Sequence, residues 1–198
     1  MAFPKSGPLL ALAIAFAAAF VILGLTFARK PWKEVDYIGS RASGKALPVA
    51  IAFTRSGYSP ALTIVAIACA AIALALRESL AAPAFVVALQ LIGQLIAGGA
   101  KRFVARLRPE VWHFRQELGF AYPSGHAVTA MFFYPSWAAL AQQWPIPHPL
   151  QIAAPALAAL WALGIGWSRL SLGAHRLTDV LGGYALGAAL LCVFLVIG

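Results

Sequence analysis

Six long apolar runs limit what this chain can fold into more than any other feature of its sequence. They cover roughly residues 8–28, 60–76, 80–100, 124–141, 150–167 and 177–197. A helix needs about 20 apolar residues to cross the hydrocarbon core of a bilayer. The sequence therefore predicts an all-α fold: a bundle of six transmembrane helices that forms a single domain over residues 1–198.

The composition excludes an ordinary soluble domain. Hydrophobic residues make up 62% of the chain and charged residues only 11%, whereas a soluble domain of this size needs a larger polar surface. The net charge of +9 arises in the gaps between apolar runs. We therefore expect membrane lipids or a phosphate ligand as partners, and no nucleic acid. The first run is longer than the apolar core of a signal peptide, so we interpret it as a retained span.

Polar residues concentrate in three gaps between the runs, at 29–58, 101–123 and 168–176. In a six-span protein alternate connections share a side, so these gaps are expected to face one side of the membrane and both termini the other. The first gap mixes basic residues with aromatic ones such as Trp32 and Tyr37. This composition is typical of helices at headgroup depth, and it predicts a short interfacial amphipathic helical segment between spans 1 and 2.

The first polar cluster is the stretch KRFVARLRP, which begins at Lys101 and contains Arg108. On a helix, residues seven positions apart lie near the same face, so these two cations would converge on one anion. The alternative is that each side chain only extends toward the aqueous interface, as a lone Lys or Arg near a membrane commonly does.

The second cluster is YPSGH, which contains Ser124, Gly125 and His126. Proline and glycine around a serine favour a turn whose backbone N–H groups point at one spot, which is the geometry of an anion site at a helix N-terminus. A histidine can exchange a proton near neutral pH. The alternative is an ordinary N-cap by Ser124, and this is compatible with the anion site.

The third cluster contains Arg169, His175 and Asp179. On a helix, a spacing of four places His175 and Asp179 on one face. A carboxylate there accepts the N–H of one imidazole nitrogen and leaves the other nitrogen free to act as a nucleophile or base. A buried structural ion pair is the alternative, but ionisable residues in a membrane segment favour a functional interpretation.

In order and spacing, the three clusters resemble the signature of the type 2 phosphatidic acid phosphatase superfamily. The matching patterns are Lys-x6-Arg-Pro, Pro-Ser-Gly-His and Ser-Arg-x5-His-x3-Asp. The resemblance implies a lipid phosphatase in which His175 attacks phosphorus and forms a phosphohistidine. It further implies that Asp179 orients His175, and that His126 protonates the leaving oxygen and then activates water.

The same resemblance assigns the phosphoryl oxygens to five residues: Lys101, Arg108, Ser124, Gly125 and Arg169. Fixed cations and backbone donors suit phosphoryl transfer, because its catalysis is mostly positioning and electrostatics. The chain has only six acidic residues, and only Asp179 lies in a cluster. We therefore expect no metal site and no cofactor.

The resemblance gives undecaprenyl diphosphate as the first expected substrate, followed by phosphatidylglycerophosphate, phosphatidic acid and lipid A phosphates. A lipid phosphotransferase and a non-catalytic scaffold that binds anionic lipid remain alternatives. The protein is expected in the bacterial cytoplasmic (inner) membrane as a monomer or weak homodimer. By resemblance the site faces outward, although thirteen of the fifteen Lys and Arg lie on its side and the positive-inside rule would place them in the cytoplasm.

Several other polar or small residues receive weaker interpretations. Arg176 fits no motif position and is expected to contact lipid headgroups. His113 and Arg115 are expected in a solvated loop, and contact with the polar part of the substrate is the alternative. The Gly183-x-x-x-Gly187 spacing suits close packing of helices, most commonly within one chain.

Overall fold

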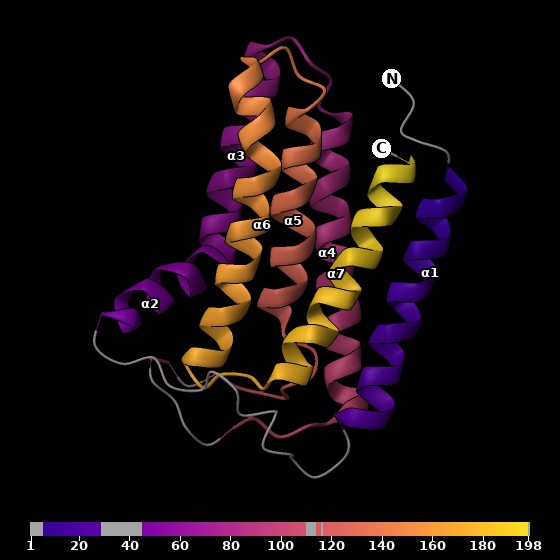
Figure 1. Ribbon diagram of the computed structural model, residues 1–198, viewed down its shortest axis with the longest axis vertical. Helices are drawn as coiled ribbons and strands as arrows, with labels where there is room; N and C mark the ends of the chain where they lie inside the picture. The colour runs from indigo at the N-terminus through magenta and orange to yellow at the C-terminus, as the bar shows by residue number, and fades with distance from the viewer. Residues whose placement is uncertain (1–5, 29–44, 110–113, 116, 198) are drawn as a thin grey trace.

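The computed structural model describes residues 6–28, 45–109, 114–115 and 117–197, and this part of the chain is all-helical, without strands (Figure 1). A π-helical turn (Leu23–Phe27) extends α1. The α-helices are α1 (Ser6–Ile22), α2 (Ala46–Ser56), α3 (Ser59–Ala75), α4 (Ala81–Val104), α5 (Gly125–Ala141), α6 (His148–Ser171) and α7 (Leu177–Ile197). The expected all-α fold is confirmed, and each predicted run coincides with a long helix to within a few residues.

Four of these helices are long and apolar enough to cross a membrane: α1 with its extension, α4, α6 and α7. The pair α2 and α3, bent by 61°, makes a fifth if it is one broken span. The 17 residues of α5 would extend about 25 Å, less than the roughly 30 Å of a hydrocarbon core. The chain is a multi-pass membrane protein, and the count of six spans stays a prediction.

A short helix lies where the interfacial segment was expected. Ala50 and Thr54, one turn apart on α2, are buried, and Ala50 packs with Leu172 at the end of α6. Val49 on the same helix is exposed, so α2 has one buried and one exposed face. The rest of that gap, including Trp32 and Tyr37, lies outside the described residues.

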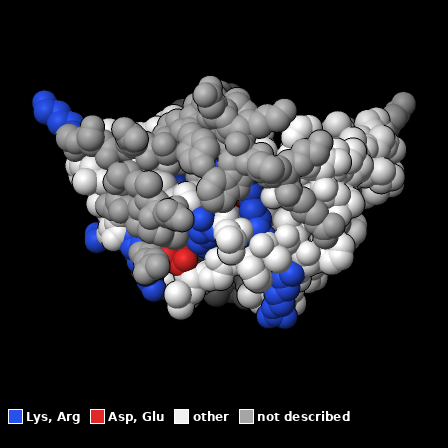
Figure 2. Space-filling model, turned by 90° about the horizontal axis from the view of Figure 1, so that it is seen from below, with Lys and Arg blue, Asp and Glu red and all other residues white. Residues whose placement is uncertain are grey.

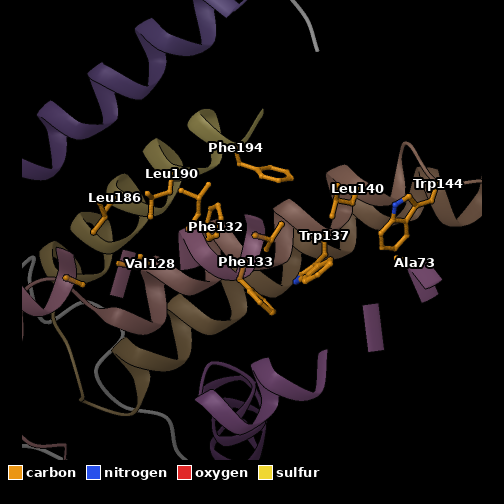
Figure 3. Close-up of a cluster of buried hydrophobic side chains, with 13 residues drawn as sticks. Ala73, Val128, Phe132, Phe133, Trp137, Leu140, Trp144, Leu186, Leu190 and Phe194 are labelled. Carbon is orange, nitrogen blue, oxygen red and sulfur yellow. The ribbon is translucent and has the colours of Figure 1, made fainter. Parts of the chain in front are cut away.

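The core of the bundle forms where α5 meets α7. Phe132 and Phe133 of α5 and Leu186, Leu190 and Phe194 of α7 belong to one buried cluster (Figure 3). Burial of apolar side chains inside a membrane protein stabilises the fold through close packing, because lipid tails are as apolar as the side chains themselves. The cluster therefore depends on how closely the two helices approach.

Two glycines permit that approach. A Cβ atom at Gly183 would lie 2.5 Å from the carbonyl oxygen of Ser124, and one at Gly187 would lie 2.6 Å from that of Val128. The Gly183-x-x-x-Gly187 spacing thus packs α7 against α5 within the chain. This contact places the first turns of the two helices side by side, and the Ser124 N–H donates to the carbonyl oxygen of Asp179 at 2.9 Å.

Candidate active site

The three polar clusters lie at one end of the bundle. At the lower end of Figure 1, α4 and α6 end and α5 and α7 begin. Figure 2, which views the molecule from this end, shows several Lys and Arg side chains and one small acidic patch next to some of them. The fold therefore brings together polar segments that are up to 78 residues apart, as from Lys101 to Asp179.

A cavity of about 370 Å³ opens between α3, α4 and α5 at this end. Its polar part is lined by Lys101, Glu117, Gly125, His126 and His175. It continues along apolar side chains such as Leu62 of α3 and Leu91 of α4. Both histidines of the predicted mechanism therefore share one cavity, which has a polar end and a largely apolar extension.

The tautomer of His175 follows from its neighbour Arg108. Arg108 Nη1 lies 3.0 Å from His175 Nε2, and a guanidinium can only donate, so Nε2 carries the lone pair. The proton then resides on Nδ1, which faces Asp179 Oδ2 at 3.7 Å. Burial lowers the pKa of His175 to about 3, so the imidazole is neutral at pH 7. An unprotonated Nε2 is what nucleophilic attack requires.

The helical geometry assumed for two pairs differs in the structure. His175 lies in the turn before α7, although it remains close to Asp179. The prediction that Lys101 and Arg108 share a helix face is wrong, because α4 ends at Val104 and Ala105 adopts a left-handed conformation with φ of 52°. Arg108 therefore reaches the site from the following loop, where its Nη1 also donates to the carbonyl oxygen of Ala174 at 3.1 Å.

Two groups donate hydrogen bonds to the carboxylate of Asp179. Arg106 Nη1 donates to Asp179 Oδ1 at 2.7 Å, and both side chains are buried. The backbone N–H of Arg176 donates to Asp179 Oδ2 at 2.9 Å. Sequence reasoning missed Arg106, although it lies inside the first cluster. A buried carboxylate needs a cationic partner, and this need could have pointed to a basic residue such as Arg106.

The expectation for Arg176 is wrong. Its side chain is 1% exposed and does not reach the surface where headgroups would lie. The turn before α7 folds inward so that its backbone can reach Asp179, and this carries Arg176 inward with it. The described parts of the chain therefore assign Arg176 to the interior of this end of the bundle.

Two of the expected phosphate-binding cations converge on a carboxylate that the sequence analysis did not single out. Arg169 Nη2 donates to Glu117 Oε1, and Arg108 Nη1 lies 3.5 Å from Glu117 Oε2. The Tyr58 hydroxyl donates to Glu117 Oε1 at 2.9 Å. The third cation, Lys101, donates to the carbonyl oxygen of Phe120 at 3.3 Å and lines the cavity.

Glu117 remains ionised in this setting. Burial alone would raise the pKa of its carboxyl, but the charge of Arg169 and the hydrogen bond from Arg169 outweigh this effect and hold the pKa at about 2. An anion therefore already lies between cations expected to bind phosphoryl oxygens. Cations that lie close together need a negative charge nearby when no substrate is bound. This need could have pointed to Glu117 in the sequence.

The start of α5 has unused hydrogen-bonding capacity. Ser124 occupies the N-cap position, yet its side chain makes no capping hydrogen bond, and its Oγ is buried without a partner among the described residues. His126 Nε2 is also buried without a hydrogen-bond partner among these residues. The His126 ring packs edge-on against the ring of Tyr58, with centroids 4.6 Å apart. Donors and acceptors left open at a helix N-terminus suit an anion.

All eight residues of the predicted site thus lie at this end of the bundle, and their catalytic and binding roles stay predictions. Within the described ranges, no three His, Cys, Asp or Glu side chains gather as a metal-ligand set. Arg115 is exposed, as expected for a solvated loop, and its guanidinium lies over the ring of Tyr58, 5.7 Å from the centroid. His113 falls outside the described residues.

Comparison with known proteins places the clusters in a family context. The pattern of the PAP2 superfamily matches residues 79–198. The chain is similar to phosphatidylglycerophosphatase B of Bacillus subtilis (strain 168), with 38% identity over 99 residues that cover 50% of this chain and 48% of that protein. It is also similar to phosphatidylglycerophosphatase B of Escherichia coli (strain K12), with 40% identity over 83 residues that cover 41% and 30%.

A further relative is the lipid A 1-phosphatase of Rhizobium johnstonii, with 32% identity over 104 residues that cover 48% of this chain and 38% of that protein. The chain therefore spans less than half the length of these curated relatives. In structure it is similar to the crystal structure of the first transmembrane PAP2 type phosphatidylglycerolphosphate phosphatase from Bacillus subtilis. That match has a TM-score of 0.82 and 25% identity, and it covers 92% of this chain and 93% of the other.

Proposed function

Because the chain belongs to the PAP2 superfamily, we propose that it is a phosphatase that hydrolyses a lipid phosphate at the membrane surface. The observation that carries the proposal is the arrangement of His175. Its neutral Nε2 accepts from Arg108 in the cavity that it shares with His126, and its Nδ1 faces Asp179. A nucleophile, its orienting carboxylate and a candidate acid therefore occur together.

In the first step, His175 Nε2 attacks phosphorus while the bond from phosphorus to the lipid oxygen breaks. His126, in its protonated form, donates a proton to the departing oxygen, which is a contribution of about 10²–10⁴-fold in such reactions. Asp179 stabilises the positive charge that develops on the His175 ring. Lys101, Arg108 and Arg169, with Ser124 and the Gly125 N–H, bind the phosphoryl oxygens, where charge concentrates.

In the second step, His126 takes a proton from water, and the resulting hydroxide attacks phosphorus. The phosphorus–nitrogen bond breaks, inorganic phosphate leaves, and His175 returns to its neutral form. The scheme consumes one water and needs no metal or cofactor. A transferase would differ only in the hydroxyl that attacks in this step, so added acceptor alcohols that lower phosphate release would favour the transferase alternative.

Phosphatidylglycerophosphate is the substrate that we place first. Two relatives and the similar structure carry names with this activity, and the cavity extends between apolar helices where a lipid leaving group would lie. Undecaprenyl diphosphate, the first expectation from sequence, stays a second prediction, with phosphatidic acid and lipid A phosphates behind it.

The proposal is tested by phosphate release from a panel of these lipids in detergent, with EDTA present throughout. We expect release from phosphatidylglycerophosphate that chelation leaves unchanged, because the cations of the site replace a metal. The His175→Ala protein supplies the background. Loss of activity on chelation would contradict the metal-free scheme. Release from no lipid of the panel would favour the scaffold alternative.

Glu117 provides a second prediction, because the substrate phosphate must displace its carboxylate from Arg108 and Arg169. Replacing Glu117 with Gln keeps the size and removes the charge. We expect KM for the substrate and the inhibition constant of inorganic phosphate each to fall by about tenfold, since charge-assisted hydrogen bonds compete for the same cations. Steady-state kinetics with product inhibition measures both constants.

The ratio of KM between the wild type and Glu117→Gln, and the corresponding ratio of inhibition constants, should stay constant from pH 5 to 8. A carboxyl with a pKa of about 2 remains charged throughout this range. Glu78→Gln, in the turn between α3 and α4 at the other end of the bundle, is the matched control. A rise in KM for Glu117→Gln would mean that Glu117 binds substrate instead of competing with it.

We also propose that α3 and α5 are spans, which restores the count of six. The burial of ten α5 residues among its neighbours supports this assignment. We further propose the bacterial inner membrane, with the site facing outward. Several of the basic residues that oppose this orientation are engaged in the interior, among them Arg106, Arg169 and Arg176, and these contribute to the fold and the site rather than to insertion.

A further inference from the structure

A polar group that the proposed mechanism does not use lies deeper in the cavity. Gln90 and Gln94 lie one turn apart on α4, and Thr129 faces them from α5. Gln90 Nε2 donates to Thr129 Oγ1 at 2.7 Å, and Gln94 Nε2 donates to the same oxygen at 3.0 Å and to the carbonyl oxygen of Gly125 at 3.2 Å. All three residues line the cavity that holds His126 and His175.

One atom of this group lacks a hydrogen-bond partner. Gln90 is 7% exposed, and its Oε1 has no donor among the described residues. A buried amide oxygen left unpaired costs free energy that a donor would recover. Acyl chains carry no N–H or O–H group that could donate a hydrogen bond, and the oxygens of a phosphate dianion can only accept one. The missing partner is therefore an N–H or O–H group that enters the cavity.

The depth of this group identifies which part of a substrate would reach it. Thr129 follows Gly125 by four residues on α5, which is about 6 Å along the helix axis. Gly125 is expected to hold the phosphate, and His126 to protonate the leaving oxygen. Gln90 and Thr129 therefore lie on the leaving-group side of the phosphate. Their distance from the phosphate is about the length of a three-carbon alcohol esterified to it.

We propose that Gln90, Gln94 and Thr129 form a subsite for a hydroxyl group carried by the leaving alcohol close to the phosphate. The subsite rests on the proposed phosphatase function and narrows its substrate class to phosphate esters of glycerol-like alcohols. Polyprenyl diphosphates carry no such hydroxyl and would leave Gln90 Oε1 unpaired. The subsite thus selects among lipids that the cationic end of the cavity would bind equally.

The test compares two lipids that differ in a single hydroxyl. One is phosphatidylglycerophosphate, and the other is the same molecule with the central hydroxyl of its headgroup glycerol replaced by hydrogen. We expect kcat/KM of the wild type to favour the hydroxylated lipid by roughly tenfold, the size of one buried hydrogen bond. In Gln90→Met, which keeps the length of the side chain, the ratio should fall to near one.

Gln143→Met is the matched control, because Gln143 is exposed beyond the end of α5, away from the cavity. Gln94→Met gives a second variant at a less buried position, and the wild-type ratio decides the matter even if both cavity variants fail to fold. A wild-type ratio of one would show that water fills the subsite and would overturn the inference while the phosphatase activity stands. A ratio that survives in both cavity variants would also overturn it. If neither lipid released phosphate, the result would instead count against the proposed function on which the subsite rests.

Discussion

Replacing His175 with alanine is expected to lower kcat by at least about 10⁴-fold, because removing a catalytic nucleophile eliminates the covalent route and leaves only binding and electrostatic effects. The variant should still bind inorganic phosphate, since Lys101, Arg108 and Arg169 remain. The bundle should also remain folded, because His175 lies in a turn outside the helices. Phosphate release in single-turnover and steady-state assays measures the loss.

Trapping the intermediate makes this prediction specific to the proposed chemistry. Acid-labile label from a phosphorus-labelled lipid should appear on wild-type protein quenched during turnover, and it should be absent from His175→Ala. In His126→Ala the label should persist longer, because the base that activates water is missing. His148→Ala, at the exposed start of α6, is the matched control. Label on His175→Ala would place the nucleophile at another residue.

The sequence predicted those parts of the molecule that depend on local patterns. Apolar runs of span length located the long helices, because a segment that crosses lipid must be long and apolar wherever it packs. His175 and Asp179 lie close together, as their spacing of four predicted, with 3.7 Å between Nδ1 and Oδ2 even though His175 precedes the helix. Gly183 and Gly187 were assigned to packing within the chain for a similarly local reason.

The rest of the site depends on contacts between distant segments. Glu117 looks like an ordinary loop residue until Arg108 and Arg169 are seen on either side of it. The role of Gln90 appears only when α4 and α5 are placed together. Lys101 and Arg108 were expected at the site for a reason that the structure overturns, because the helix ends between them. Spacing along a helix cannot reveal where that helix will stop.

Arg106 is expected to have the second-largest effect. Replacing Arg106 with alanine removes the cation from a buried pair and leaves the Asp179 carboxylate without a cation at Oδ1. Breaking a buried ion pair on one side typically costs about 3–5 kcal/mol of stability. We also expect kcat to fall by roughly 10²-fold with little change in KM, because a displaced Asp179 no longer aligns His175, and small misplacements of a nucleophile have effects of this size.

Thermal unfolding in detergent and steady-state kinetics measure the two effects of Arg106→Ala separately. Arg102→Ala, at the exposed side of the last turn of α4, is the matched control and should change neither. Arg106→Lys keeps the charge and should recover part of the stability and part of kcat. If kcat stayed at the wild-type value while stability fell, Arg106 would have a structural role only.

The double variant Arg106→Met, Asp179→Asn separates the stability of the pair from its function. Replacing a buried ion pair by uncharged side chains of similar volume is often neutral for stability, so the double variant should unfold at a higher temperature than Arg106→Ala. Its kcat should stay at or below that of Arg106→Ala, because asparagine cannot stabilise the charge that develops on His175 during attack. Recovery of turnover together with stability would mean that the carboxylate of Asp179 serves the fold alone, and the assignment of His175 as an oriented nucleophile would then lose its support.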